Sequence, residues 1–262
     1  MEIPFSKWHA AIPHRRSRRN YDSTDLEPDL LSHMQNICRD FRPFPQARAE
    51  LTTQSPDEIF RGVIGHYGKI KGAPALIAFI GKMDDPYIQE KVGYLGEGII
   101  LEATAKDLAT CWVGGFFRPK VAASIVGTGE NERVLAVTPI GHAVKDFSPQ
   151  ERIMTGFGRT HRRKPLAELV TGLGQAEWPH WMKSALEAAT LAPSAINRQP
   201  WRFYVEPDSI TVSVYGSRLE FGISKRLDCG IAMLHMEVAA LECGVQGKWE
   251  FLEAPKVAKF TI

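Results

Sequence analysis

Two long helical segments constrain this chain more than any other feature. The stretch from Ile88 to Thr110 places small and apolar residues on one face. A second stretch carries apolar residues at helical spacing: Leu227, Ile231, Leu234, Val238 and Leu241. In each half a helix and a strand come before the long segment, and a tryptophan-containing strand follows it, at Trp112 and Trp249. The repetition favours an internal duplication, although two such helices also occur in other α+β chains of this length.

The remaining segments fit an α+β fold in two parts. The run 72–81 is apolar and bounded by glycines, which predicts a buried strand, and 133–141 predicts a second one. A helix over 178–191 and strands within 202–215 follow later in the chain. Gly172 and Gly174 mark the boundary between the two parts. We therefore expect a first half at residues 1–172 and a shorter second half at residues 173–262, tightly packed as one unit.

Composition excludes several classes of protein. The chain has 262 residues, of which 44% are hydrophobic and 24% charged, as in ordinary soluble proteins. No apolar run approaches the roughly 20 residues of a membrane helix, and the N-terminus lacks the apolar core of a signal peptide, so we expect a cytoplasmic protein. The net charge of +2 gives no case for a nucleic-acid or membrane partner. The cysteines and histidines are scattered without metal-ligand spacing, which predicts no metal site.

A basic segment near the N-terminus could bind a phosphate. Residues 15–19 read Arg-Arg-Ser-Arg-Arg. In an extended segment alternate side chains point the same way, so Arg15, Ser17 and Arg19 can converge on one ligand while Arg16 and Arg18 face the other side. Two guanidiniums and a hydroxyl suit a phosphate dianion. Alone, such a run is more often a solvated surface or a nonspecific contact with polyanions.

A loop in the second half carries a second motif, which supports a ligand-binding role for the basic segment. Residues 193–201 read Pro-Ser-Ala-Ile-Asn-Arg-Gln-Pro-Trp and join a helix to a strand, a common position for binding sites. Pro200 favours an extended conformation at Gln199. Asn197 carries the donor and the acceptor needed to bind the pyrimidine edge of a flavin.

Together, R-x-S-x-R-x-Y near the N-terminus and P-S-x-x-N-x-Q-P-W in this loop resemble the FMN-dependent nitroreductase family. The runs GAPALIAFIG, CWVGGF, VTPIGHAVK and RRKPLAELV resemble further family segments in the same order, so the resemblance covers most of the chain. It implies an α+β nitroreductase-like fold with antiparallel central sheets flanked by helices.

The resemblance also implies roles for matching positions. Arg15, Ser17 and Arg19 would hold the FMN phosphate and ribityl chain, with the backbone of Arg16 nearby and Arg163 as a second phosphate contact. The other implied cofactor contacts are Lys69 at the pyrimidine end, backbone at Gly114 and Gly115 near flavin N5, and Pro193, Ser194, Ala195 and Asn197 along the ring. His161 is a weaker candidate at the phosphate. No side chain is implied as a catalytic residue, because the flavin carries the chemistry.

The chain departs from the family pattern in one respect. Ordinary members are homodimers in which one subunit supplies the R-x-S motif and the other the P-S-x-x-N loop. Here each motif occurs once, in opposite halves. The resemblance is therefore to an internally duplicated branch, a single-chain pseudo-dimer with one FMN per chain. A homodimer that exchanges the motifs between chains would also hold one flavin per chain, so this alternative stays open.

The implied activity is transfer of a hydride from NAD(P)H through FMN to an electron-poor acceptor such as a nitroaromatic, a quinone or a flavin. NAD(P)H would be a transient donor, because no G-x-G-x-x-G loop follows a strand. The alternative is an FMN-binding carrier or sensor without NAD(P)H turnover. A polyanion-binding module using the basic clusters is a third hypothesis, which the small net charge disfavours.

Overall fold

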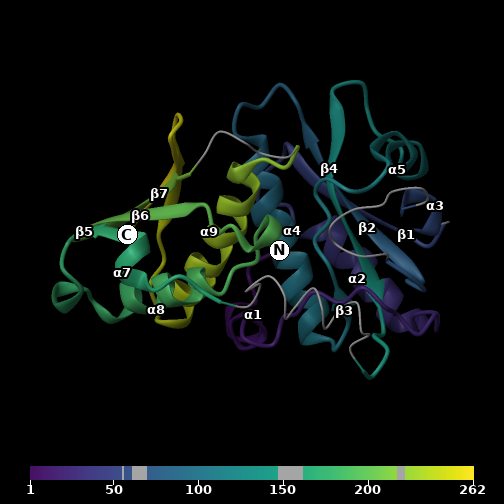
Figure 1. Ribbon diagram of the computed structural model, residues 1–262, viewed down its shortest axis with the longest axis horizontal. Coiled ribbons are helices and arrows are strands. Elements are labelled where there is room, and N and C mark those ends of the chain that lie inside the picture. Colours follow the sequence, from purple (N-terminus) through teal and green to yellow (C-terminus); the bar gives the residue numbers. More distant parts are fainter. Residues whose placement is uncertain (55, 61–69, 147–161, 217–221) are drawn as a thin grey trace.

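The fold consists of two β-sheets with a pair of long helices between them (Figure 1). This computed structural model describes residues 1–54, 56–60, 70–146, 162–216 and 222–262. In chain order the elements are α1 (Phe5–Ala11), α2 (Pro28–Asp40), β1 (Ala47–Thr52), α3 (Pro56–Phe60), β2 (Ala75–Lys82), α4 (Ile88–Ala105), β3 (Ala109–Thr110), α5 (Pro119–Val126), β4 (Glu132–Gly141), α7 (Leu166–Leu169), β5 (Val170–Gly172), η1 (Gln175–Glu177), α8 (His180–Thr190), η2 (Ala195–Asn197), β6 (Trp201–Glu206), β7 (Ser209–Val214), α9 (Lys225–Glu242), β8 (Lys248–Phe251) and β9 (Lys256–Thr261).

The first sheet has the strand order β1-β2-β4-β3, and every neighbouring pair is antiparallel. Its central strand β2 is apolar along almost its whole length, and the side chains from Ala75 to Ile80 are fully buried. A strand that is covered on both faces needs apolar residues at successive positions, which is why this run does not alternate. The glycine-bounded run 72–81 was therefore correctly predicted as a buried strand.

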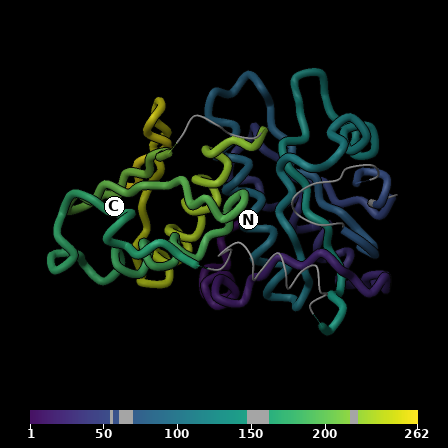
Figure 2. The backbone as a smooth tube through the Cα atoms, viewed as in Figure 1, coloured from purple at the N-terminus to yellow at the C-terminus, as the bar shows by residue number. Residues whose placement is uncertain are grey.

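The second sheet has the order β5-β6-β7-β9-β8. Its strands β6, β7, β9 and β8 repeat the order and antiparallel pairing of β1, β2, β4 and β3. The additional strand β5 pairs with β6 in parallel. Figure 2 shows the chain passing from the first sheet (purple to teal) to the second (green to yellow), with β5 already on the side of the second sheet. A strand that ends at Gly172 thus completes the sheet of the second half.

Helices α4 and α9 lie side by side between the sheets (Figure 1) and are buried along most of their length. Each has 18 residues. Their first residues, Ile88 and Lys225, are separated by the same number of positions as Trp112 and Trp249, the tryptophans that follow the two helices. The predicted long helix from Ile88 to Thr110 ends earlier, at Ala105. Asp107 then adopts a positive φ of 57°, which no α-helix continues through.

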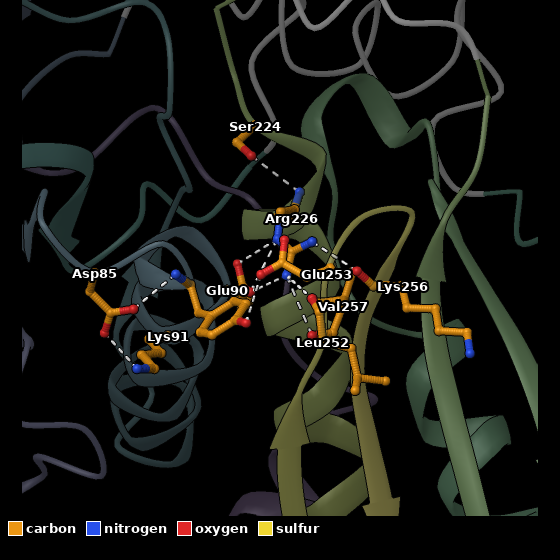
Figure 3. Close-up of polar contacts among 10 residues, drawn as sticks. Asp85, Glu90, Lys91, Ser224, Arg226, Leu252, Glu253, Lys256 and Val257 are labelled. Carbon is orange, nitrogen blue, oxygen red and sulfur yellow. Dashed lines mark hydrogen bonds and ion pairs between the residues drawn. The ribbon is translucent and has the colours of Figure 1, made fainter.

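A cluster of polar contacts joins the N-terminal ends of the two helices (Figure 3). Arg226 of α9 donates through Nε and Nη2 to both carboxylate oxygens of Glu90 in α4. The same guanidinium donates to the carbonyls of Leu252 and Lys256 in the β8–β9 hairpin, at 2.9 and 2.8 Å. One arginine therefore connects α4, α9 and the edge of the second sheet.

The expected helix near 57–66 is described only as far as Phe60, as α3. The other expected elements occur with ends that shift by a few residues. Within the described ranges, no helix has the length and apolarity needed to cross a membrane.

Candidate flavin site

The R-x-S-x-R segment runs in extended conformation beside the edge strand of the first sheet. Ser17 pairs with Thr110 of β3 in a parallel bridge, and the backbone N–H of Arg18 donates to the carbonyl of Thr110 at 2.9 Å. Arg16 is exposed and its side chain turns back to donate to the carbonyl of Pro13 at 2.8 Å. Arg18 donates to the carbonyl of Val144 at 2.6 Å. The side chain of Arg16 also donates to the carbonyl of Arg15 at 2.8 Å, so Arg16 and Arg18 are both held by backbone carbonyls.

Arg15 is the buried member of the segment, with 7% of its surface exposed. Its Nε lies 3.8 Å from Oε1 of Glu97 and has no hydrogen-bond partner within the described part of the chain. Burial lowers the pKa of Arg15, and the attraction of Glu97 is the strongest opposing effect. A buried guanidinium with an unused donor is an unfavourable arrangement unless an anion binds to it.

Arg163 supplies a second guanidinium within electrostatic range of Arg15. It donates to the carbonyls of Ala192 and Leu191 at 2.9 Å and to Oδ1 of Asn197 at 3.1 Å. Burial lowers the pKa of Arg163 to about 10, and repulsion by Arg15 and then Arg16 adds to the effect. These interactions mean that Arg15 and Arg163 are within electrostatic reach of each other. The basic segment of the first half therefore lies within electrostatic range of Arg163, which bonds to the loop of the second half.

The loop of residues 193–199 has an unusual backbone. Ile196, Asn197 and Gln199 all have positive φ, at 49°, 54° and 46°, so the extended conformation expected at Gln199 before Pro200 was wrong. For a β-branched residue such as Ile196 this region is strained, and surrounding contacts must stabilise it. The hydroxyl of Ser194 accepts the backbone N–H of Gln199 at 2.9 Å, which closes the loop. Strain of this kind is concentrated at binding sites.

Asp228 of α9 holds the loop of residues 193–199 in place by accepting two hydrogen bonds from it. This buried carboxylate accepts the backbone N–H of Ala195 at 3.1 Å and Nε of Arg198 at 2.6 Å. Arg198 also donates to the carbonyl of Ile223 at 2.8 Å. The predicted contacts Pro193, Ser194, Ala195 and Asn197 are all partly exposed above this anchor. The loop therefore presents a compact surface that is fixed from the helix side.

The turn at Gly114 and Gly115 lies next to Ile223, which is hydrogen-bonded to Arg198 of the loop. A Cβ added to Gly114 would lie 3.0 Å from the side chain of Ile223, the residue whose carbonyl accepts from Arg198. Gly115 is exposed. Ile223 thus connects the turn to the loop. Lys69 and His161 lie outside the described residues.

Sequence reasoning missed the residues that support the site from behind. Gln199 is buried, and its side chain accepts the backbone N–H of Lys164 at 2.8 Å and donates to the carbonyl of Arg162 at 3.1 Å. Glu97 and Asp228 lie on otherwise apolar helix faces. A charged residue inside an apolar helix is rare without a partner, and that was the available signal.

The fold resembles those of known proteins. A "putative nitroreductase" from Thermotoga maritima superimposes with a TM-score of 0.65 at 19% identity, covering 97% of this chain and 93% of that one. A nitroreductase family protein from Clostridium difficile matches 62% of this chain and 94% of its own, at 20% identity and a TM-score of 0.45. A nitroreductase with bound FMN from Bacteroides fragilis matches 54% and 90%, at 16% identity and a TM-score of 0.44. No curated protein matches the sequence significantly.

The two sheets around a central helix pair are thus a nitroreductase-like α+β fold. The model of one family, described as "Putative TM nitroreductase", matches residues 8–240. This chain belongs to that family.

Proposed function

We propose that this protein binds one FMN per chain and transfers a hydride from NAD(P)H through it to an electron-poor small molecule, such as a nitroaromatic, a quinone or a flavin. The observation that carries the proposal is that Arg163 bonds to Asn197 of the loop while the buried Arg15 of the first half lies within electrostatic range of Arg163, inside a single chain. Membership of the nitroreductase family and the FMN-containing structure from Bacteroides fragilis support it.

The residues at this place fit the phosphate end of FMN. Arg15 is a buried guanidinium whose side chain donates no hydrogen bond among the described residues, and Arg163 carries a charge that burial and its neighbours disfavour. A phosphate dianion would relieve both conditions by accepting charge-assisted hydrogen bonds. Ser17 and Arg19 from the same extended segment, with the backbone of Arg16, would complete the contacts.

The loop and the glycine turn fit the ring end. Pro193, Ser194 and Ala195 are compact and partly exposed, so a flat ring can lie against them. Asn197 would bind the pyrimidine edge, and its Oδ1 is already oriented by Arg163. Gly114 and Gly115 would let backbone N–H groups approach flavin N5. Lys69 is proposed at the pyrimidine end on the family resemblance alone.

When bound, FMN supplies the two-electron redox chemistry that the side chains lack. The protein's part is then to hold the ring, to keep one face open for donor and acceptor in turn, and to place positive charge and N–H donors near N1 and O2. No side chain is needed as a nucleophile. The direct test is a visible spectrum of the purified protein, followed by anaerobic addition of NADH and NADPH. A flavin spectrum that bleaches supports the reductase, and a flavin that stays oxidised favours a carrier.

The phosphate assignment has its own test. Arg15→Ala combined with Arg19→Ala should abolish FMN retention through gel filtration. Arg39→Ala combined with Arg42→Ala is the matched control, because it removes the same charge from two exposed positions. Full flavin occupancy in the first variant would show that the phosphate binds elsewhere.

We also infer that residues 1–172 and 173–262 mimic the two subunits of a dimeric nitroreductase. The equal lengths of α4 and α9 and the repeated strand order support this. Mixing the Arg15/Arg19 variant with an Asn197→Ala variant, after partial unfolding and refolding, separates the two arrangements. A site formed within one chain is not restored by mixing, whereas motifs exchanged between chains of a homodimer would regenerate some intact sites.

A further inference from the structure

A fully buried carboxylate and imidazole lie directly behind Arg15. Glu97 of α4 and His235 of α9 both have 0% exposure. Oε1 of Glu97 is 2.9 Å from Nε2 of His235, and Oε2 accepts the indole N–H of Trp112 at 2.6 Å. The same Oε1 lies 3.8 Å from Nε of Arg15. Both carboxylate oxygens are thus fixed, and one of them faces the guanidinium.

The hydrogen-bond partners fix the proton count of this pair. Nδ1 of His235 lies 3.0 Å from the carbonyl oxygen of Ala188, which can only accept, so Nδ1 carries a hydrogen. If Nε2 and Glu97 were both unprotonated, two acceptors would face each other at 2.9 Å in a buried site, at a large cost. One proton therefore lies between Nε2 and Oε1. Whichever atom holds it, the pair of Glu97 and His235 has no net charge.

We propose that Glu97 and His235 are positioning residues for the phosphate of FMN: the pair holds one proton and directs Oε1 at Nε of Arg15, so that the Nη donors remain available to the phosphate. The proposal rests on the proposed function, because it assumes the FMN phosphate at Arg15. Among the described residues the side chain of Arg15 donates no hydrogen bond, so the contact with Glu97 is what orients its guanidinium.

The rival explanation is that the pair only joins α4 to α9 and α8. If the pair were purely structural, altering it would weaken the binding of FMN and of riboflavin equally, because it would act through the stability of the fold. A positioning pair affects only the part of the ligand that Arg15 contacts. Riboflavin, which lacks the phosphate, distinguishes the two explanations.

Glu97→Gln isolates the contact with Arg15. The amide oxygen can still accept from Trp112, and the amide NH₂ can donate to Nε2 of a neutral His235. The net charge is zero before and after the change, so the electrostatic potential at the phosphate is little altered. What changes is the group that faces Arg15, because an N–H now lies opposite the N–H of Nε. The guanidinium loses its orienting acceptor.

The experiment measures dissociation constants of the apoprotein for FMN and for riboflavin by quenching of flavin fluorescence. We expect Glu97→Gln to weaken the binding of FMN about tenfold, the size of one charge-assisted contact. The affinity for riboflavin should not change. Glu102→Gln is the matched control, since Glu102 is a second fully buried carboxylate of α4, bound to Lys7, Trp8 and His33 instead. It should not alter the preference for FMN over riboflavin.

An unchanged or increased preference for FMN in Glu97→Gln, or an equal loss of both ligands, overturns the proposal. If the wild-type protein itself shows no preference for FMN, the proposed phosphate site is wrong instead. Should Glu97→Gln fail to fold, His235→Gln gives a second test. It removes the shared proton and the imidazole that holds Oε1 in place, so Glu97 pairs with Arg15 as a full carboxylate and the preference for FMN should again fall; an unaltered preference overturns the proposal.

Discussion

Gly93 and Gly230 make reciprocal contacts at the crossing of α4 and α9. A Cβ added to Gly93 would lie 2.1 Å from the carbonyl oxygen of Leu227, and one added to Gly230 would lie 2.0 Å from the carbonyl oxygen of Glu90. Each glycine therefore meets the carbonyl three residues before the other glycine. This is the symmetry expected of two equivalent helices packed across a two-fold axis.

Either glycine should therefore tolerate no side chain. Gly230→Ala forces the helix backbones apart and should lower the free energy of unfolding by about 3 kcal/mol, the upper range for overpacking. Gly129→Ala is the control, because the nearest atom to its added Cβ is 3.6 Å away and belongs to a side chain. Urea unfolding followed by circular dichroism gives both values. Equal stabilities for the two variants would contradict the close helix contact.

Arg226→Met should be strongly destabilising, since it leaves Glu90 buried without its cation (Figure 3). We expect a loss of about 3–5 kcal/mol. Burial raises the pKa of Glu90, against the attraction of Arg226. Without Arg226 that pKa rises further, so the folded state binds a proton that the unfolded state has released.

The sign of the pH dependence follows from that difference. A carboxyl whose pKa is raised by folding loses stability as pH rises, so the deficit of Arg226→Met should be larger at pH 8 than at pH 5. Lys259→Met, which breaks the exposed pair with Glu206, should change the unfolding midpoint only slightly. A deficit that does not depend on pH would argue against Glu90 as the uncompensated group.

The pair of Arg48 and Glu132 has the opposite pH dependence. Hydrogen bonds from Arg48 lower the pKa of Glu132 to about 2 from an ordinary value of 4.5. Its contribution is complete above pH 4.5 and is lost as pH falls towards 2. Glu132→Gln should cost about 1 kcal/mol at pH 7, since solvent screens the pair, and much less at pH 2.5. Glu50→Gln, which alters an exposed partner of the same Arg48, should show a smaller change with pH.

Asp228→Asn should weaken the binding of FMN and of riboflavin by the same factor. An amide cannot accept from both Ala195 and Arg198, and its NH₂ would face the guanidinium. The strained loop then loses its anchor, and we expect about tenfold weaker binding of both ligands. Asp208→Asn, at an exposed turn, is the control. A loss confined to FMN would place Asp228 at the phosphate rather than beneath the ring.

Much of this fold could be predicted from periodicity. The glycine-bounded apolar run gave β2, and the apolar stripe of Leu227 to Leu241 gave α9, because burial on known faces leaves a pattern in the sequence. The parallel pairing of β5 with β6 could not be predicted, because only three residues form it and they carry no apolar pattern. The early end of α4 depends on one backbone angle at Asp107.

The candidate site, too, could be predicted only in part from the sequence. Arg15, Ser17 and Arg19 were proposed from their alternation, and their role as phosphate contacts stays a prediction; the structure buries Arg15 within electrostatic range of Arg163. Glu97, His235 and Asp228 were not identified, because each contacts the site through long-range pairs that no local pattern encodes. The positive φ of Ile196 was also invisible, since its sequence neighbours give no turn signal stronger than a single Asn.

The central claim, one FMN site built from both halves of one chain, is tested most directly by the flavin-to-chain ratio. Protein reconstituted with excess FMN and freed of unbound ligand is assayed for flavin absorbance after denaturation and for chain concentration by amino-acid analysis. One working site per chain predicts one FMN per chain, falling to none in the Arg15/Arg19 double variant. A ratio near two, or a wild-type chain that retains no flavin, would contradict the account.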